Sequence, residues 1–131
     1  MNEAELNAIV DAWVAGQEAE PGAPQYGSNW SAVSQVLGWA VPGSEPELLW
    51  RFILAAYRRQ LSGHIFGMLA AGPLEDLLSY YGREYIERVE ALAREDERFR
   101  LLLGGVWRLG MTEDVWGRVQ SARLLPFTPA G

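Results

Sequence analysis

The residues best suited to do chemistry in this sequence are the adjacent acids Glu75 and Asp76 and the single histidine, His64. Two carboxylates that share a cleft can act as general acid and general base. His64 follows Ser62 by two residues, but a serine–histidine nucleophile also needs a third group and an oxyanion hole, which are recognised by geometry. One hypothesis for function is therefore a small helical enzyme or metabolite-binding domain that uses Glu75 and Asp76, or His64.

The residues around the acidic pair also predict a helix that explains both acids without a catalytic role. Pro73 suits the first turn of a helix, because its fixed φ is helical and its missing N–H would have no partner there. Glu75 and Asp76 then lie near the positive end of the helix dipole. Gly82 suits a helix end that requires a positive φ. The sequence thus predicts one short helix that stops at Gly82 and buries Leu74, Leu77, Leu78 and Tyr81.

The composition excludes several kinds of site. The chain of 131 residues has no cysteine, which rules out disulfides, thiolate metal ligands and cysteine nucleophiles. All 11 basic residues are arginine, so the lysine of a phosphate-binding P-loop is missing. Neither HExxH nor GxSxG occurs, and no Glu has a His three residues later, as a helical di-iron centre requires. We therefore predict no catalytic residue, no metal site and no cofactor.

The charge is distributed unevenly along the chain. Residues 1–47 hold seven acidic residues and no basic one, a net charge of −7, whereas residues 48–131 hold ten acidic residues and eleven arginines, a net charge of +1. An acidic N-terminal third disfavours binding to nucleic-acid phosphates. It favours solubility and is compatible with a basic protein partner, because complementary charge speeds and orients encounter.

The sequence also lacks the signals of a membrane or secreted protein. No apolar run is long enough to span a bilayer. The N-terminus, MNEAELNAIV, is acidic and lacks the basic segment that opens a signal peptide. We therefore expect a soluble, cytoplasmic protein with no membrane partner. Its oligomeric state stays open.

Apolar residues at helical spacing predict the N-terminal helices. The first helix is expected to end at Gly16, with a buried face formed by Leu6, Ile9, Val10, Trp13 and Val14. Residues 16–28 are rich in Gly and Pro and predict a loop. A short second helix, capped by Ser28 or Asn29, is expected to stop at Pro42, and its apolar residues are Trp30, Val33 and Leu37.

Capping residues mark the later helices. Ser44 and Glu47 have the spacing of a capping box and precede a helix that is apolar around much of its circumference, which is typical of a central helix. Asp96 and Thr112 are the expected caps of the last two helices. The first of these two is expected to bury a stripe formed by Phe99, Leu102, Leu103, Val106 and Trp107.

Two features of the C-terminal half have simple structural interpretations. Gly104 and Gly105 interrupt an apolar stripe, which favours close helix packing or a kink. The segment 82–100 holds five arginines and six acids, so we expect a solvated helix face that neutralises itself through i,i+4 pairs. The expected pairs are Glu84 with Arg88 and Glu90 with Arg94.

These elements predict one domain over residues 1–131. It consists of acidic N-terminal helices with a Gly/Pro loop (1–43), a helical core (44–123) and a Pro-containing tail (124–131). No segment alternates apolar and polar residues as a strand would. The predicted fold class is all-α, an irregular bundle or HEAT-like stack of about six or seven short helices.

Six tryptophans are the remaining lead. Most lie on predicted apolar faces, so filling the core is their expected role. Trp30 and Trp39 flank a short helix beside the acidic Gly/Pro loop, which also contains Tyr26. Tryptophan and tyrosine are favoured at protein interfaces. The predicted partner-binding residues are Tyr26, Trp30 and Trp39 with the acids Glu18 and Glu20.

Residues 45–120 resemble a family of small bacterial domains of unknown function. The shared features are an early Trp, a central apolar helix, an AAGPLEDLL-type element, a Gly before an Ile-Glu helix, an LLGGVW-type helix and a short last helix near a Trp. The matching positions are Trp50, Gly72 to Leu78, Gly82, Ile86, Glu87, Phe99, Leu103 to Trp107, and Asp114 to Trp116. The resemblance implies an all-α domain and brings no established activity.

Three hypotheses for function follow. The first is a small acidic bacterial protein that binds another protein, as an immunity protein or an inhibitor that neutralises a cognate toxin or enzyme. The second is the enzyme or metabolite-binding domain described above. The third is a structural or regulatory subunit of a larger complex.

Overall fold

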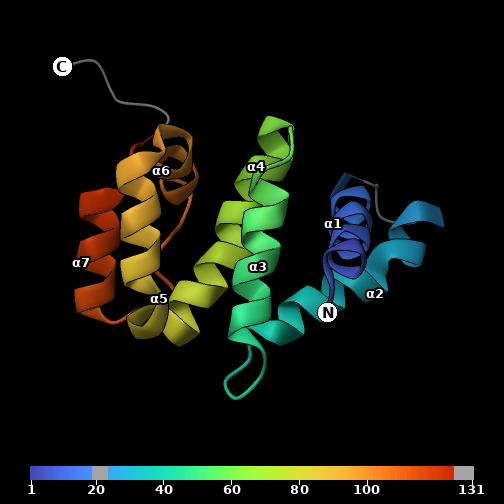
Figure 1. The fold of residues 1–131 in the computed structure, drawn as a ribbon, viewed down its shortest axis with the longest axis horizontal. Helices are drawn as coiled ribbons and strands as arrows, with labels where there is room; N and C mark the ends of the chain where they lie inside the picture. Colours follow the sequence, from blue (N-terminus) through green and yellow to red (C-terminus); the bar gives the residue numbers. More distant parts are fainter. Residues whose placement is uncertain (19–23, 126–131) are drawn as a thin grey trace.

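The computed structural model describes residues 1–18 and 24–125, with the backbone alone for residues 24–28. The described chain folds into α-helices with one π-helical segment and no strand, so the predicted all-α class is confirmed (Figure 1). No described helix is long and apolar enough to cross a membrane. In chain order the elements are α1 (Glu3–Glu18), α2 (Pro24–Trp39), α3 (Pro46–Tyr57), α4 (Gly63–Leu69), η1 (Ala70–Leu74), α5 (Glu75–Glu95), α6 (Glu97–Leu103) and α7 (Glu113–Ala122).

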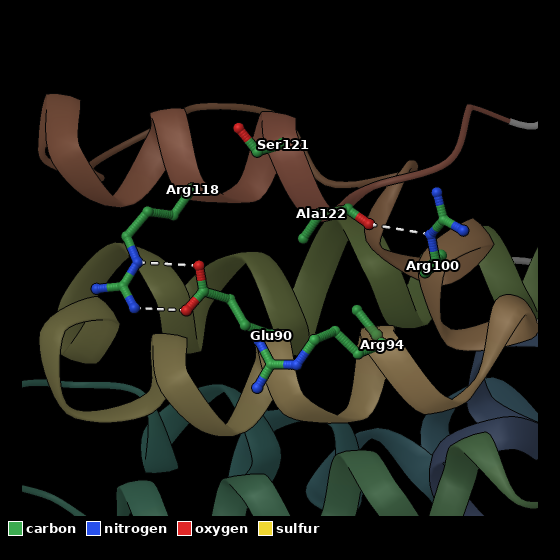
Figure 2. Close-up of a pocket in the computed structure, with 7 residues that line it drawn as sticks. Glu90, Arg94, Arg100, Arg118, Ser121 and Ala122 are labelled. Carbon is green, nitrogen blue, oxygen red and sulfur yellow. Dashed lines mark hydrogen bonds and ion pairs between the residues drawn. The ribbon is translucent and has the colours of Figure 1, made fainter.

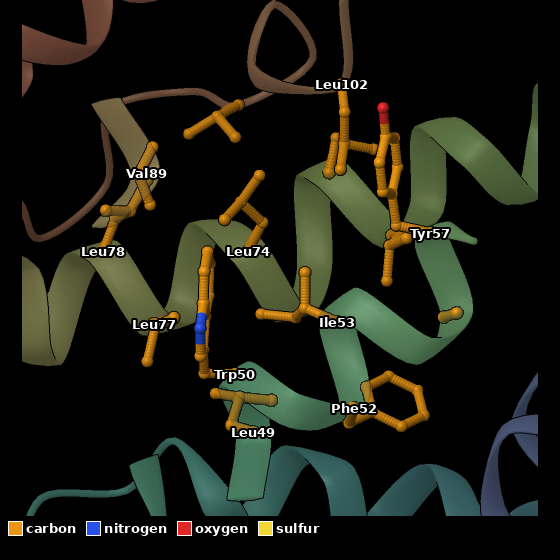
Figure 3. Packing of buried hydrophobic residues seen from close by; sticks show 14 of the residues in the cluster. Leu49, Trp50, Phe52, Ile53, Tyr57, Leu74, Leu77, Leu78, Val89 and Leu102 are labelled. Atoms are coloured by element: carbon orange, nitrogen blue, oxygen red, sulfur yellow. The ribbon is translucent and has the colours of Figure 1, made fainter. Parts of the chain in front are cut away.

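Helix α3 is the centre of the fold, as its broad apolar surface predicts. It contacts α1 and α2 on one side and α4, η1 and α5 on the other (Figure 1). The fully buried ring of Phe52 makes edge contacts with Trp13 of α1, at 5.5 Å between centroids, and with Trp39 of α2, at 6.0 Å. On the other side Trp50 and Tyr57 contact Phe99 of α6. Figure 3 shows how side chains of α3 pack toward Leu74 and Leu77 in this continuous core.

The predicted helix caps are confirmed at Asp96 and Thr112 and are wrong before α2 and α3. Helix α2 begins at Pro24, so Ser28 and Asn29 lie inside it and neither is its cap. Asp96 caps α6 by accepting the Arg98 and Phe99 N–H groups, and Thr112 caps α7. The predicted capping box before α3 is wrong, because Glu45 is the N-cap residue and makes no side-chain cap bond. Glu47 instead accepts hydrogen bonds from Arg88 and from the Tyr85 hydroxyl of α5, each at 2.7 Å. These two donors lower the pKa of Glu47.

The first two helices are longer than the sequence predicts. Helix α1 continues past Gly16 to Glu18, and α2 begins at Pro24, so the loop predicted over 16–28 is wrong at both ends. Gly16 is buried against α2, where an added Cβ would lie 3.1 Å from the nearest methyl carbon of Val33. The glycine therefore permits close packing of two helices, and this packing stabilises a helical position that glycine alone disfavours.

The helix predicted to end at Gly82 continues to Glu95. Elements α4, η1 and α5 follow one another without a break, and Pro73 lies inside the π-helical segment. The chain kinks at Tyr81, which has non-helical φ and ψ of −131° and 27°. The φ of Gly82 is not positive, and an added Cβ there would lie 2.9 Å from Val115 of α7. Close contact between α5 and α7 explains this glycine.

The arginine-rich face of α5 also pairs differently from the prediction. Arg88 pairs with Glu47 of α3, and Glu90 pairs with Arg118 of α7. The expected i,i+4 pairs within the helix are therefore replaced by pairs between helices. A sequence pattern within one helix cannot reveal this choice, because the competing partners come from distant segments of the chain.

Candidate functional site

The loop between α6 and α7, residues 104–112, presents the most exposed aromatic residue of the described side chains. We name it the Trp107 loop. Its first two residues lie where segments approach closely, since an added Cβ at Gly104 would overlap the Leu124 carbonyl oxygen and one at Gly105 would lie 2.9 Å from the Ala70 Cβ. Helix α6 ends at Leu103, and Gly104 is its C-cap residue.

The Trp107 loop is held along the start of α5 by two hydrogen bonds. The backbone N–H of Trp107 donates to Oε1 of Glu75 at 2.8 Å, and the backbone N–H of Gly110 donates to Oγ of Ser79 at 3.4 Å. Val106 and Met111, near the two ends of this stretch, are buried in the core. The backbone of the loop is thus fixed at several points.

The side chains between these fixed points face solvent. Trp107 is 75% exposed and Leu109 is 72% exposed. Tyr80, next to Ser79 on α5, is 55% exposed. We call Tyr80, Trp107 and Leu109 the Trp107 surface. The bond between Gly110 and Ser79 brings the loop alongside α5, so these three residues come from adjoining segments. Single exposed apolar residues are normal on a protein surface, whereas a contiguous apolar patch marks an interaction site.

Glu75 has a structural role in this arrangement. Its side chain is buried, and its carboxylate accepts the Trp107 N–H. The neighbouring Asp76 is half-buried, and burial, with a smaller contribution from the charge of Glu75, raises the pKa of its carboxyl group. Of the two acids, Glu75 therefore holds the Trp107 loop.

His64 lies elsewhere. It is exposed in the first turn of α4, eleven residues before Glu75 in one continuous helical run, which corresponds to about 16 Å along the axis. Ser62 caps α4 by accepting the Ile65 N–H at 3.2 Å. Among the described residues, no three His, Asp or Glu side chains are grouped to hold a metal ion. The structure thus does not bring His64 together with the acidic pair.

The aromatic residues predicted to bind a partner divide into two groups. Trp39 is 6% exposed and contacts Phe52, so it is a core residue and its ring is not available at the surface. Trp30 is 47% exposed on α2, and Glu18 is exposed at the end of α1. The side chain of Tyr26 and the whole of Glu20 lie outside the described residues.

The prediction that Trp107 lies on the buried stripe of α6 is wrong. The helix ends four residues earlier, and the available signal was the pair Gly104 and Gly105, followed by Gly110. Clustered glycines end helices more often than they continue them.

The fold and the site together define a single-domain, all-α protein with an exposed aromatic loop fixed on its surface. The chain belongs to a family of unknown function, DUF6869, which it matches over residues 20–126. The match includes every helix from α2 to α7. No curated protein and no solved structure was found to match the chain. The expected membership of a family of unknown function is confirmed.

Proposed function

We propose that this chain is a small protein-binding protein that binds and blocks the functional site of its partner, as an immunity protein or an inhibitor does. The exposure of Trp107 on a fixed loop is the observation that supports this proposal most directly. Tryptophan is the residue type most enriched among those that dominate binding energy at interfaces. The proposed docking site is the Trp107 surface.

The hydrogen bonds of the Trp107 loop favour binding. Ordering a flexible loop costs free energy when two proteins associate. The bonds to Glu75 and Ser79 and the burial of Val106 and Met111 hold this loop in place before a partner arrives. Less free energy is then lost in ordering the loop on binding, so the contacts made by the loop contribute more to affinity.

Charge favours a basic partner. The chain has a net charge of −6. Next to the Trp107 loop, Glu113 and Asp114 are exposed at the start of α7, and Glu84 is exposed on α5. Arg83 and Arg108 are the exposed arginines of the same region, so acids outnumber bases there. Complementary charge accelerates association at low salt.

The first experiment is affinity purification of the tagged protein from its own host, with a salt wash and mass spectrometry. A single stoichiometric basic partner is the expected result. The purified partner is then tested for toxicity or enzymatic activity, which the chain is expected to suppress. Failure to retain any stoichiometric partner would contradict the proposal.

The docking site is tested with matched variants. Trp107→Ala and Leu109→Ala are expected to weaken partner binding, and the loss for Trp107→Ala is expected to be about 30-fold or more, as at an interface hot spot. Leu37→Ala is the control, because Leu37 is a similarly exposed apolar residue on α2. If Trp30→Ala abolishes binding and Trp107→Ala does not, the partner docks on α2 and the Trp107 surface is the wrong site.

A further inference from the structure

A second, chemically different site lies between α5, α6 and α7. These helices surround an open pocket of about 430 Å³ (Figure 2). Each helix contributes one arginine: Arg94 from α5, Arg100 from α6 and Arg118 from α7. The other lining residues are Glu90, Ala93, Ser121 and Ala122.

Two polar contacts fix the walls of this pocket. Nε of Arg118 donates to Oε2 of Glu90 at 3.0 Å, and a second guanidinium nitrogen of Arg118 donates to Oε1. Nε of Arg100 donates to the Ala122 carbonyl oxygen at 3.3 Å. The first contact joins α5 to α7 and the second joins α6 to α7. Because Arg118 lowers the pKa of Glu90, this carboxylate is ionised at neutral pH.

The lining has more positive than negative charge. Three arginines and one glutamate give the pocket a charge of +2, in a chain whose net charge is −6. Among the described residues, Arg94 has no hydrogen-bond or ion-pair partner, and the two terminal nitrogens of Arg100 have none. An arginine with unused donors is suited to bind an oxyanion with two hydrogen bonds.

The charges lie at two ends of the pocket. Figure 2 shows Arg94 and Arg118 around Glu90 toward one end, Arg100 at the other, and Ala122 between them. Arg94, Arg118 and Glu90 together leave one positive charge at the first end, and Arg100 supplies one at the second. The methyl groups of Ala93 and Ala122 line the pocket as well. The volume is within the range of small-molecule sites, about 300–1,000 Å³.

We propose that this pocket binds a small organic acid with two separated anionic groups joined by an apolar segment. Arg100 holds one anionic group and Arg94 holds the other, while the apolar segment lies against the alanines. The proposal is independent of the Trp107 surface, which is formed by different residues.

The test is a titration of the isotope-labelled protein with straight-chain dicarboxylates of increasing length, followed by NMR at constant low ionic strength. Amide signals of Ala93, Ser121 and Ala122 are expected to shift in a saturable way. Affinity should be highest at one chain length, and the monocarboxylate of that length should bind at least about tenfold more weakly, as the loss of one charge-assisted hydrogen bond requires. Affinity that is independent of length and of the second carboxylate would overturn the proposal.

Variants then locate the binding groups. Arg94→Gln removes a side chain without a described partner, so the protein is expected to fold normally. Its affinity for the best dicarboxylate should fall to that of the monocarboxylate. Arg108→Gln is the matched control, since Arg108 is exposed and lies outside the pocket. Equal losses in the two variants would show that binding depends on overall charge alone and would refute the site.

Discussion

Trp39 and Trp107 occupy opposite environments in one small fold. Trp39 is the last residue of α2, is 6% exposed and contacts Phe52 of the central helix. Trp107 follows α6 by four residues and is 75% exposed. The backbone at Trp107 is nevertheless fixed, because its N–H is bonded to Glu75. The same residue type thus stabilises the core in one region and is presented to solvent by a fixed backbone in the other.

The difference depends on where each helix ends relative to the core. Trp39 is the last residue of α2, and the Trp39 ring packs against Phe52 of α3. Helix α6 ends at Leu103, before Trp107, and the two glycines that follow permit close approach to the Leu124 carbonyl oxygen and to Ala70. A substitution at Trp39 should therefore change the stability of the fold, whereas a substitution at Trp107 should change the exposed surface and leave stability almost unchanged.

The largest effect is expected from Trp39→Ala. Removal of a buried tryptophan side chain leaves a cavity and is expected to cost about 3–5 kcal/mol of the free energy of unfolding. Urea denaturation followed by circular dichroism measures this loss. Leu37→Ala, on the exposed face of the same helix, is the control and is expected to change stability by about 0.5 kcal/mol or less. Similar effects of the two substitutions would contradict the burial of Trp39.

Gly104→Ala tests the close approach between the end of α6 and the segment after α7. The added methyl group would overlap the Leu124 carbonyl oxygen, a backbone atom, so the segment after α7 must shift. The expected cost is about 1–3 kcal/mol, as for other overpacked sites. Gly117→Ala is the matched control, because Gly117 lies inside α7 with open space around it. This control is expected to stabilise the helix by about 0.5–1 kcal/mol. Thermal unfolding distinguishes the two signs.

Glu75→Ala tests the attachment of the Trp107 loop. The substitution removes a buried acceptor and leaves the Trp107 N–H without it, at an expected cost of about 1–2 kcal/mol. Hydrogen exchange at the Trp107 amide should accelerate, whereas the core of α3 should be less affected. Glu75→Gln keeps an acceptor oxygen and is expected to have a smaller effect. Unchanged exchange in Glu75→Ala would show that other contacts hold the loop.

The sequence predicted the helical class, the central position of α3 and the caps Asp96 and Thr112, because these depend on local spacing and local hydrogen bonds. It did not define the buried face of α2, because Trp30, Val33 and Leu37 were predicted only as the apolar residues of that helix. Trp30 and Leu37 are exposed, whereas the buried residues of this helix form a stripe displaced by a small rotation: Ala32, Val33, Val36 and Trp39. Both stripes include Val33, so helical spacing alone did not separate them.

The candidate site could be predicted only in part. Glu75 was identified as a candidate, but its role depends on Trp107, which lies 32 residues away in the sequence. The glycines that follow α6 permit close approach to Ala70 and Leu124, which also come from other segments. Contacts of this kind are set by tertiary packing, and no local pattern in one sequence specifies them.

The smallest effect on stability is expected from Trp107→Ala. Most of the ring is already in contact with water, and the hydrogen bond to Glu75 uses the backbone N–H, which alanine retains. The free energy of unfolding should therefore change by about 0.5 kcal/mol or less. Quenching of tryptophan fluorescence by iodide supplies an independent readout, because the variant should lose an accessible component that Trp39→Phe retains. A loss of stability comparable to that of Trp39→Ala would mean that the Trp107 ring is packed in solution, and the proposed docking surface would then be wrong.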